Sequence, residues 1–235
     1  MRLVFRWLGR LLLAALGLVL LLQLYYFVCI GWWAHFNPSS TSFMRAALSQ
    51  LRESNPKAEL KHVWVPYDRI SDNLKSAVIT SEDAKFTEHE GVDWQAVEKA
   101  YESNLKAAGN KRKRIKGGST ITQQLAKNLF LSGERSYLRK GQELVITYML
   151  EFWMTKERIL EIYLNVAEWG TGIFGAEAAA RHYYGISAAQ LSAPQAAQLA
   201  AMLPRPRFYE AHRSSPYLAR RTSAILRWMS GADLP

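Results

Sequence analysis

The stretch Glu82-Asp83-Ala84-Lys85-Phe86-Thr87-Glu88-His89-Glu90-Gly91 says more about fold and chemistry than any other ten residues of this 235-residue chain. This stretch contains more polar side chains than the packing of a domain would account for. Apolar residues from Leu74 to Val78 follow Ser71, a good N-cap, at helical spacing, so we expect a helix that ends near Glu82. The negative end of a helix dipole makes a carboxylate more basic, which suits a general base. A solvated carboxylate at a helix end is the plain alternative.

Three other residues of this stretch are expected to shape the site around Glu82. His89 is more typical of a hydrogen-bonded structural histidine than of a catalytic one. Asp83 is expected to orient its neighbours, and Phe86 belongs to the same cluster. One histidine among spaced acids is not a ligand set, so we expect no metal site here.

A second polar segment runs Gly117-Gly118-Ser119-Thr120-Ile121-Thr122-Gln123-Gln124-Leu125-Ala126-Lys127-Asn128. Its start could be a turn in which a serine or threonine caps a helix over residues 121–131. The segment lacks the GK[ST] of a nucleotide-binding P-loop, which excludes that function.

A third cluster combines Arg139, Lys140 and Glu143, whose spacings of four and three put them on one helix face. An ordinary surface ion pair would explain these three residues in isolation. Together with Lys127, however, the converging cations suit the oxygens of a pyrophosphate. Two carboxylates with cations beside one of them suit glycosyl transfer from an anionic leaving group.

The remaining chain predicts one mainly α domain without a convincing strand series. Residues 169–175 form a glycine-punctuated loop, and Pro204 and Pro206 end the last strong helical pattern. Residues 109–118 form a loop whose basic run, 111–114, is either solvated or steers phosphate or lipid. Further helices are expected over residues 93–108, 136–153, 155–165, 176–184 and 192–202.

The N-terminal part is a membrane anchor by its composition. From Leu11 to Trp33 there is one polar side chain and no charge, and such a run spans roughly 30 Å as a helix. Three arginines precede it, so the positive-inside rule predicts a cytoplasmic N-terminus, residues 1–10, and an exported remainder. A cleaved signal peptide and a lipoprotein at Cys29 fit less well, since the run is long and Val28 is bulky. We expect a connector over residues 34–66 and the catalytic domain over residues 67–235.

The formal charge of +10 would suggest nucleic acid as a partner, but export argues against it. An exported, tethered, basic domain more plausibly meets anionic lipid head groups or phosphates. The only cysteine lies in the apolar run, so we expect no disulfide or thiolate chemistry in the exported part.

Taken together, these segments resemble the peptidoglycan glycosyltransferase family, and within it the monofunctional biosynthetic transglycosylases. The resemblance covers about residues 65 to 210. It rests on E-D-x-x-F-x-x-H-x-G at 82–91, G-G-S-T-I-T-Q-Q-L-x-K-N at 117–128, R-K-x-x-E at 139–143 and K-x-x-I-L-E-x-Y-L-N at 156–165. Four ordered motifs of this length are very specific. Ser192-Ala193-Pro194-Gln195 departs from the acidic form expected of many relatives.

The resemblance implies a lysozyme-like α fold and lipid II as substrate. Glu82 would be the base and Glu143 the second acidic residue. The donor's diphosphate would be held by Lys127, Arg139 and Lys140, and the site would be shaped by Ser119, Thr120, Gln124 and Asn128. No cofactor is required, although a divalent cation, Mg or Mn, could assist at the diphosphate.

The implied reaction polymerises lipid II into β-1,4-linked glycan with inversion at the MurNAc anomeric carbon and release of undecaprenyl diphosphate. We expect no transpeptidase activity. The location would be the bacterial inner membrane, with the catalytic domain in the periplasm. Partners would be lipid II, the growing strand, membrane lipid and cell-wall synthesis or division proteins. A glycan-cleaving hydrolase or lytic transglycosylase and a non-catalytic envelope scaffold remain as alternatives.

Overall fold

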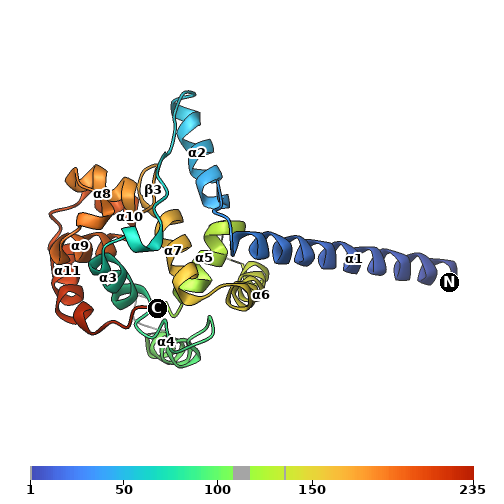
Figure 1. Cartoon of the computed structure of the whole chain (residues 1–235). Helices are drawn as coiled ribbons and strands as arrows, with labels where there is room; N and C mark the ends of the chain where they lie inside the picture. The colour runs from blue at the N-terminus through green and yellow to red at the C-terminus, as the bar shows by residue number, and fades with distance from the viewer. Residues whose placement is uncertain (1, 108–116, 135) are drawn as a thin grey trace. The chain divides into compact units, whose positions relative to one another are not determined.

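The computed structural model describes residues 2–107, 117–134 and 136–235 (Figure 1). Its contacts group the chain into two compact units, residues 1–37 and 38–235. The first unit contains helix α1, Arg2–Trp33. Its part from Phe5 to Trp33 is long and apolar enough to cross a membrane, and this part includes the predicted span of residues 11–33.

The second unit is mainly α, as predicted. Its helices are α2 (Ser42–Ser54), α3 (Asp72–Glu82), α4 (Trp94–Ala107), α5 (Ile121–Phe130), α6 (Tyr137–Trp153), α7 (Lys156–Val166), α8 (Ala176–Tyr184), α9 (Ala193–Met202), α10 (Pro206–Ala211) and α11 (Pro216–Trp228). The predicted helices therefore exist, with ends that differ by a residue or two. The basic run 111–114 lies outside the described residues.

Serine and threonine side chains start the helices that carry the polar clusters. Ser71 accepts a hydrogen bond from the Leu74 amide at the start of α3, and Thr155 accepts one from the Arg158 amide at the start of α7. Thr120 and Gln123 form a reciprocal capping box that begins α5. Each cap satisfies amides that the first helical turn leaves without partners. The sequence thus sets where α3, α5 and α7 begin.

Two groups of helices position the site. In Figure 1, α3 lies against α9, and α9 lies against α11. In the second group, α5 packs against α2, α6 and α7. Between them the core is closed by fully buried side chains such as Leu74, Phe86 and Ile121. Burying such a side chain contributes roughly 1.5–3 kcal/mol, so the two groups are firmly held.

A small sheet corrects the expectation of a plain loop at residues 169–175. Strands β1 (Lys61–His62), β2 (Glu168–Gly170) and β3 (Ile173–Phe174) form it in the order β1-β3-β2. β1 runs parallel and β2 antiparallel to β3. Strands of two or three residues are too short to show an alternating pattern, which is why the sequence did not reveal them.

The C-terminal part also differs from expectation, because two helices follow the prolines that were predicted to end helical structure. Pro206 and Pro216 each occupy the first position of a helix, α10 and α11. Proline is favoured there, since the amide it lacks would have no partner inside the helix. These prolines therefore start helices as well as follow them.

Of residues 34–66, which were expected to form a connector, residues 38–66 belong to the second unit by their contacts. Met44 and Ala47 of α2 are buried, and α2 packs against α5. β1 pairs with β3 over a long sequence separation. In the sequence, the apolar residues of α2 did not distinguish a helix that packs on the domain from a helix in an ordinary linker.

Candidate active site

Glu82 is the last residue of α3, and neutral donors hold both of its carboxylate oxygens. Gln124 Nε2 donates to Oε2 at 3.0 Å, and Ser81 Oγ donates to Oε1 at 3.0 Å. The Glu82 side chain is 10% exposed, so it is largely buried yet open to a pocket. This contact set fixes the direction of the carboxylate without using all of its lone pairs.

Tyr163 of α7 sets the orientation of the Gln124 amide. Its hydroxyl donates to Gln124 Oε1 at 3.1 Å, which leaves the amide nitrogen to face Glu82. Burial raises the pKa of Tyr163 well above its usual value, and the charges of Glu82 and Asp83 raise it further. The phenol therefore stays protonated and acts as a donor.

Arg221 of α11 is a site residue that the sequence did not reveal. Its guanidinium lies 3.6 Å from Glu82 Oε1 and donates to Ser81 Oγ at 3.0 Å. Its Nε is buried and has no hydrogen-bond partner among the described residues. In the sequence, nothing distinguishes Arg221 from its neighbour Arg220 in this amphipathic segment. Only the packing of α11 shows that Arg221 belongs to the site.

A pocket of about 660 Å³ opens beside Glu82, and we call it the Glu82 pocket. This volume is typical of a site for a small organic molecule or part of a larger one. Its lining combines α3, the segment before α5, and the C-terminal helices: Ser81, Glu82, Gly117, Ser119, Gln124, Ala201, Pro204, Arg205, Tyr209, Tyr217 and Arg221. Two arginines and two tyrosines make the C-terminal wall suited to polar ligands.

Glu143 has very different surroundings from Glu82. It is buried in α6, and its carboxylate accepts hydrogen bonds from Arg139 at 2.5 Å and from Lys140. Neither Glu143 nor Arg139 lines the Glu82 pocket. The predicted grouping of the three on one helix face is therefore observed, with Glu143 as the residue that holds the two cations in place.

Lys140 connects this cluster to the Glu82 pocket. Its ammonium also donates to Ser119 Oγ at 3.3 Å, and Ser119 lines the pocket. The side chain is 45% exposed, so the charge is accessible to a ligand. Lys140 thus contacts a residue that lines the same pocket as Arg221.

Lys127 completes the set of cations. Burial lowers its pKa first of all, and Arg139 and Lys140 lower it further, whereas Glu143 and Glu82 raise it. Lys127 therefore lies within electrostatic reach of both glutamates and both other cations. Such crowding of like charges is expected where an anion is to be bound.

A neighbouring pocket of about 200 Å³ contains Lys127, and we call it the Lys127 pocket. It shares Gln124 and Pro204 with the Glu82 pocket, so the two are adjacent. Its lining is Phe43, Gln124, Lys127, Asn128, Tyr163, Val166, Ala167, Glu168, Leu203, Pro204 and Pro206. The predicted residue Asn128 is placed here.

The other predicted residues lie around the end of α3 and the start of α5, and two of them, Asp83 and Thr120, line a further pocket with Glu82 and Ser119. Asp83 accepts from the Ile121 amide at 3.0 Å and contacts His89 Nε2 at 2.9 Å. Phe86 is fully buried, and buried Thr120 donates to the Gly91 carbonyl at 2.6 Å. These contacts join the end of α3 to the start of α5. Asp83 therefore contacts both the Ile121 amide and the His89 ring, while the site roles expected of these residues stay predictions.

Gly91 makes this junction possible. Its φ of +84° is a backbone conformation that favours glycine. A Cβ there would also come within 2.7 Å of Thr147 Cγ2 and 2.9 Å of Glu151 Cγ. The last position of the Glu82–Gly91 stretch is therefore fixed by the close approach of α6.

The side chains present form a poor site for a divalent cation. Both oxygens of Glu143 already accept from Arg139 and Lys140. Within residues 2–107, 117–134 and 136–235, no group of three or more His, Cys, Asp or Glu side chains could hold a metal ion. A cation at the diphosphate stays a prediction.

Comparison with known proteins agrees with this geometry. The family model described as "Transglycosylase" matches residues 47–230. The chain is 72% identical over 218 residues to the biosynthetic peptidoglycan transglycosylase of Janthinobacterium sp. (strain Marseille), covering 93% of each chain. It is 68% identical to that of Herminiimonas arsenicoxydans, covering 96% of each, and 56% identical to that of Thiobacillus denitrificans over the whole of both. The chain therefore belongs to the transglycosylase family, a family of glycosyltransferase enzymes with a lysozyme-like fold.

Proposed function

We propose that this enzyme polymerises lipid II by inverting glycosyl transfer, with Glu82 as the general base. The acceptor's GlcNAc 4-hydroxyl oxygen attacks C1 of the donor MurNAc, and its proton passes to Glu82. The bond from C1 to the diphosphate oxygen breaks on the opposite face. The products are a β-1,4 linkage and undecaprenyl diphosphate.

The observation that carries the proposal is the setting of Glu82. Its carboxylate opens onto a pocket that Ser119 also lines, and the accessible ammonium of Lys140 donates a hydrogen bond to Ser119. A proton acceptor and a cation therefore face the same space. This is what the attack of a hydroxyl on a carbon bearing an anionic leaving group requires.

The leaving group needs charge stabilisation and no proton, because a diphosphate is already a good anion. Lys127, Arg139 and Lys140 would provide that stabilisation, with Glu143 keeping the last two in position. Both carboxylate oxygens of Glu143 already accept hydrogen bonds from Arg139 and Lys140. The proposal therefore assigns no step to a metal ion.

The positions of the carboxylates favour synthesis over cleavage. A glycan-cleaving enzyme has a sugar alkoxide as its leaving group and needs a second carboxyl group as proton donor. Glu143 does not line the Glu82 pocket and is bound by two cations. It is therefore badly placed to protonate a glycosidic oxygen.

The length and apolar composition of α1 support a location at the membrane. We propose that α1 anchors the enzyme in the inner membrane, with the arginine-containing N-terminus in the cytoplasm and the catalytic unit in the periplasm. Lipid II presented at the outer leaflet would then be in reach. We also propose that the enzyme has no transpeptidase activity, so that the strands leave it without cross-links.

The deciding experiment offers the purified full chain two substrates, lipid II and intact sacculi. We expect long, uncross-linked glycan from lipid II and no soluble fragments from sacculi. Fragments from sacculi without polymer from lipid II would identify a cleaving enzyme instead. No product from either substrate, together with cellular complementation by a Glu82→Gln variant, would identify a scaffold.

A further inference from the structure

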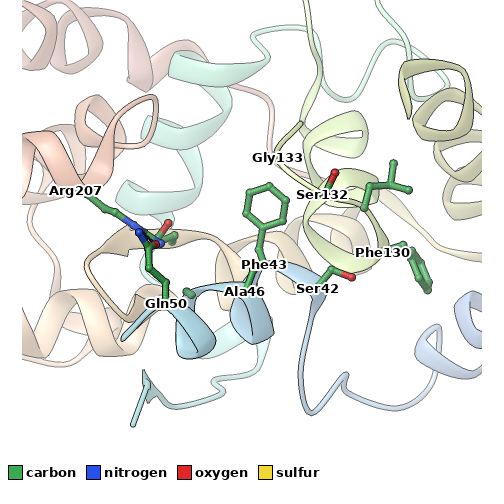
Figure 2. A pocket seen from close by; sticks show the side chains of 11 residues that line it. Ser42, Phe43, Ala46, Gln50, Phe130, Ser132, Gly133 and Arg207 are labelled. Carbon is green, nitrogen blue, oxygen red and sulfur yellow. Dashed lines mark hydrogen bonds and ion pairs between the residues drawn. The ribbon is translucent and has the colours of Figure 1, made fainter. Parts of the chain in front are cut away.

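Two further pockets lie next to those of the site, one on each side. Figure 2 shows the first, of about 440 Å³, along α2, where Phe43, Ala46 and Phe130 contribute to a mostly apolar lining. It shares Phe43 with the Lys127 pocket. The second, of about 210 Å³, lies between the end of α3 and α11, and we call it the Trp228 pocket. Only the second adjoins the Glu82 pocket, where the new bond would form.

The Trp228 pocket begins at the residues that hold the Glu82 carboxylate. Its lining is Thr80, Ser81, Arg221, Ala224, Ile225 and Trp228. Ser81 and Arg221 line the Glu82 pocket as well. Because Ser81 Oγ donates to Glu82 Oε1 at 3.0 Å, one side chain separates the inner end of the Trp228 pocket from the proposed base. A substituent of a sugar that reacts at Glu82 is therefore in reach of this pocket.

Helix α11 forms the long wall of the Trp228 pocket. Arg221, Ile225 and Trp228 follow one another at spacings of four and three, so they lie on one face of the helix. At about 1.5 Å per residue, Trp228 lies about 10 Å further along α11 than Arg221. An extended peptide rises about 3.3 Å per residue, so about three residues span that distance. The wall has the length of a short peptide.

The lining of the Trp228 pocket is mixed in character. Trp228 is 69% exposed, and Ala224 and Ile225 add aliphatic surface beside it. Thr80 and Ser81 contribute hydroxyls, and the lining contains the cation Arg221 and no carboxylate.

This mixture favours a peptide over the other parts of the substrate. A prenyl chain would desolvate the guanidinium of Arg221 without giving it a partner. A sugar would meet few polar groups, because Arg221 already donates to Ser81 Oγ at 3.0 Å. A peptide offers alkyl side chains to Trp228, amides to the hydroxyls and carboxylates that a positively charged lining tolerates.

We propose that the Trp228 pocket binds the acidic peptide that the MurNAc sugar of lipid II carries, and that it selects peptide-bearing substrate. The inference rests on the proposed function. The peptide is attached to the MurNAc ring through the lactyl ether at C3, close to the C1 that is attacked beside Glu82. Its first residues therefore start near Ser81, and Trp228 packs against the residues that follow.

The experiment compares two substrates on the purified full chain. One is lipid II with its peptide, and the other is the same lipid-linked disaccharide with a bare lactyl group. Trp228→Ala removes the aromatic wall of the pocket. Leu226→Ala is the matched control, because Leu226 is 39% exposed on the same helix and does not line the pocket. Thermal unfolding verifies that α11 is intact, and the readout is kcat/KM for each substrate.

We expect the unaltered chain to prefer the peptide-bearing substrate by about tenfold, and Trp228→Ala to lower kcat/KM for that substrate by about five- to tenfold. With the peptide-free substrate, Trp228→Ala should stay within about twofold of the unaltered chain, since the pocket is then not engaged. Trp228→Phe should recover part of the preference, and Leu226→Ala should keep all of it. Equal losses on both substrates, as a contact of Trp228 with membrane lipid would give, would overturn the inference.

A second arm tests the acidic character of the ligand. Ala224 lines the pocket and is exposed, so Ala224→Glu adds a negative charge there, and Ala224→Gln adds the same bulk without the charge. We expect kcat/KM for peptide-bearing lipid II to be about three- to tenfold lower with Ala224→Glu than with Ala224→Gln, because like charges repel. Amidation of the peptide carboxylates should abolish this difference. Equal values for the two variants would contradict the inference, whereas failure of the unaltered chain to polymerise either substrate would count against the proposed function.

Discussion

The two glutamates of the site differ in what their oxygens contact. Glu82 accepts from an amide and a hydroxyl, has Arg221 at 3.6 Å, and opens onto a pocket. Glu143 is bound by Arg139 and Lys140 and lines none of the pockets described above. The first carboxylate still has lone pairs facing a ligand, whereas those of the second are occupied by cations. These contacts fit the proposed division of roles, in which Glu82 accepts a proton and Glu143 holds Arg139 and Lys140 in place.

The largest expected effect tests the Glu82 side of this comparison. Glu82→Gln keeps size and hydrogen bonding but cannot take a proton, so we expect polymerisation of lipid II to fall by about 10²–10⁴-fold. The thermal unfolding temperature should stay close to that of the unaltered chain. Glu88→Gln, at an exposed position of the same stretch, serves as control and should be fully active. Near-normal turnover by Glu82→Gln would refute the assignment of the base.

The Glu143 side should respond in both activity and stability. Glu143→Gln leaves Arg139 partly buried without its anionic partner, so we expect a loss of about 3 kcal/mol in the free energy of unfolding. Misplaced cations should lower kcat/KM by about 10²-fold. Chemical denaturation and steady-state kinetics measure the two. Glu102→Gln, which removes only an exposed ion pair with Lys106, is the control. Full activity after Glu143→Gln would mean that Arg139 and Lys140 do not need Glu143 to keep them in position.

Arg221 should contribute to catalysis by positioning Glu82 through Ser81. We expect Arg221→Gln to lower kcat by about tenfold with KM little changed, because losing one charge-assisted hydrogen bond costs about 1.5 kcal/mol or more. Arg221→Lys should recover part of kcat. Arg220→Gln, at the exposed neighbouring position, is the matched control. Equal losses in kcat for both glutamine variants would indicate a general effect on α11.

The smallest expected effect is a shift of the pH profile. Because burial lowers the pKa of Lys127, this residue loses its charge at a lower pH than an ordinary lysine does. Activity that needs the charge is present below that pKa and is lost as pH rises through it. Lys127→Arg stays protonated, so the alkaline limb of kcat/KM should move to higher pH, whereas Lys106→Arg should not move it. An unmoved limb for Lys127→Arg would mean that another group titrates there.

The features that could be predicted best from the sequence are those that residues close together in the chain determine. Ser71 was identified as an N-cap, and a serine or threonine was expected to cap the helix over residues 121–131, because a hydroxyl before an apolar helical pattern acts within one turn. The mainly α fold, the membrane-spanning length of α1 and the lysozyme-like class were likewise correct. The motifs also led to Glu82, Gln124 and Lys127, which the structure brings to adjoining pockets.

What the sequence missed depends on contacts between distant segments. Arg221 reaches Glu82 only because α11 packs on α9 and α3, and no spacing rule relates positions 82 and 221. Pro204 and Pro206 were interpreted as the end of the last strong helical pattern, although Pro206 begins α10 and a further helix, α11, follows. β1 becomes a strand through its pairing with β3, more than a hundred residues later.

The three side chains that surround the Glu82 carboxylate have a consequence for the enzyme during its synthesis. Ser81, Gln124 and Arg221 lie in early, middle and late parts of the chain, and translation delivers them in that order. A nascent chain that has folded through α9 still lacks the wall that α11 supplies. Until α11 docks, Glu82 lacks the neighbouring guanidinium of Arg221, so we expect partly made copies to turn over more slowly than the complete enzyme.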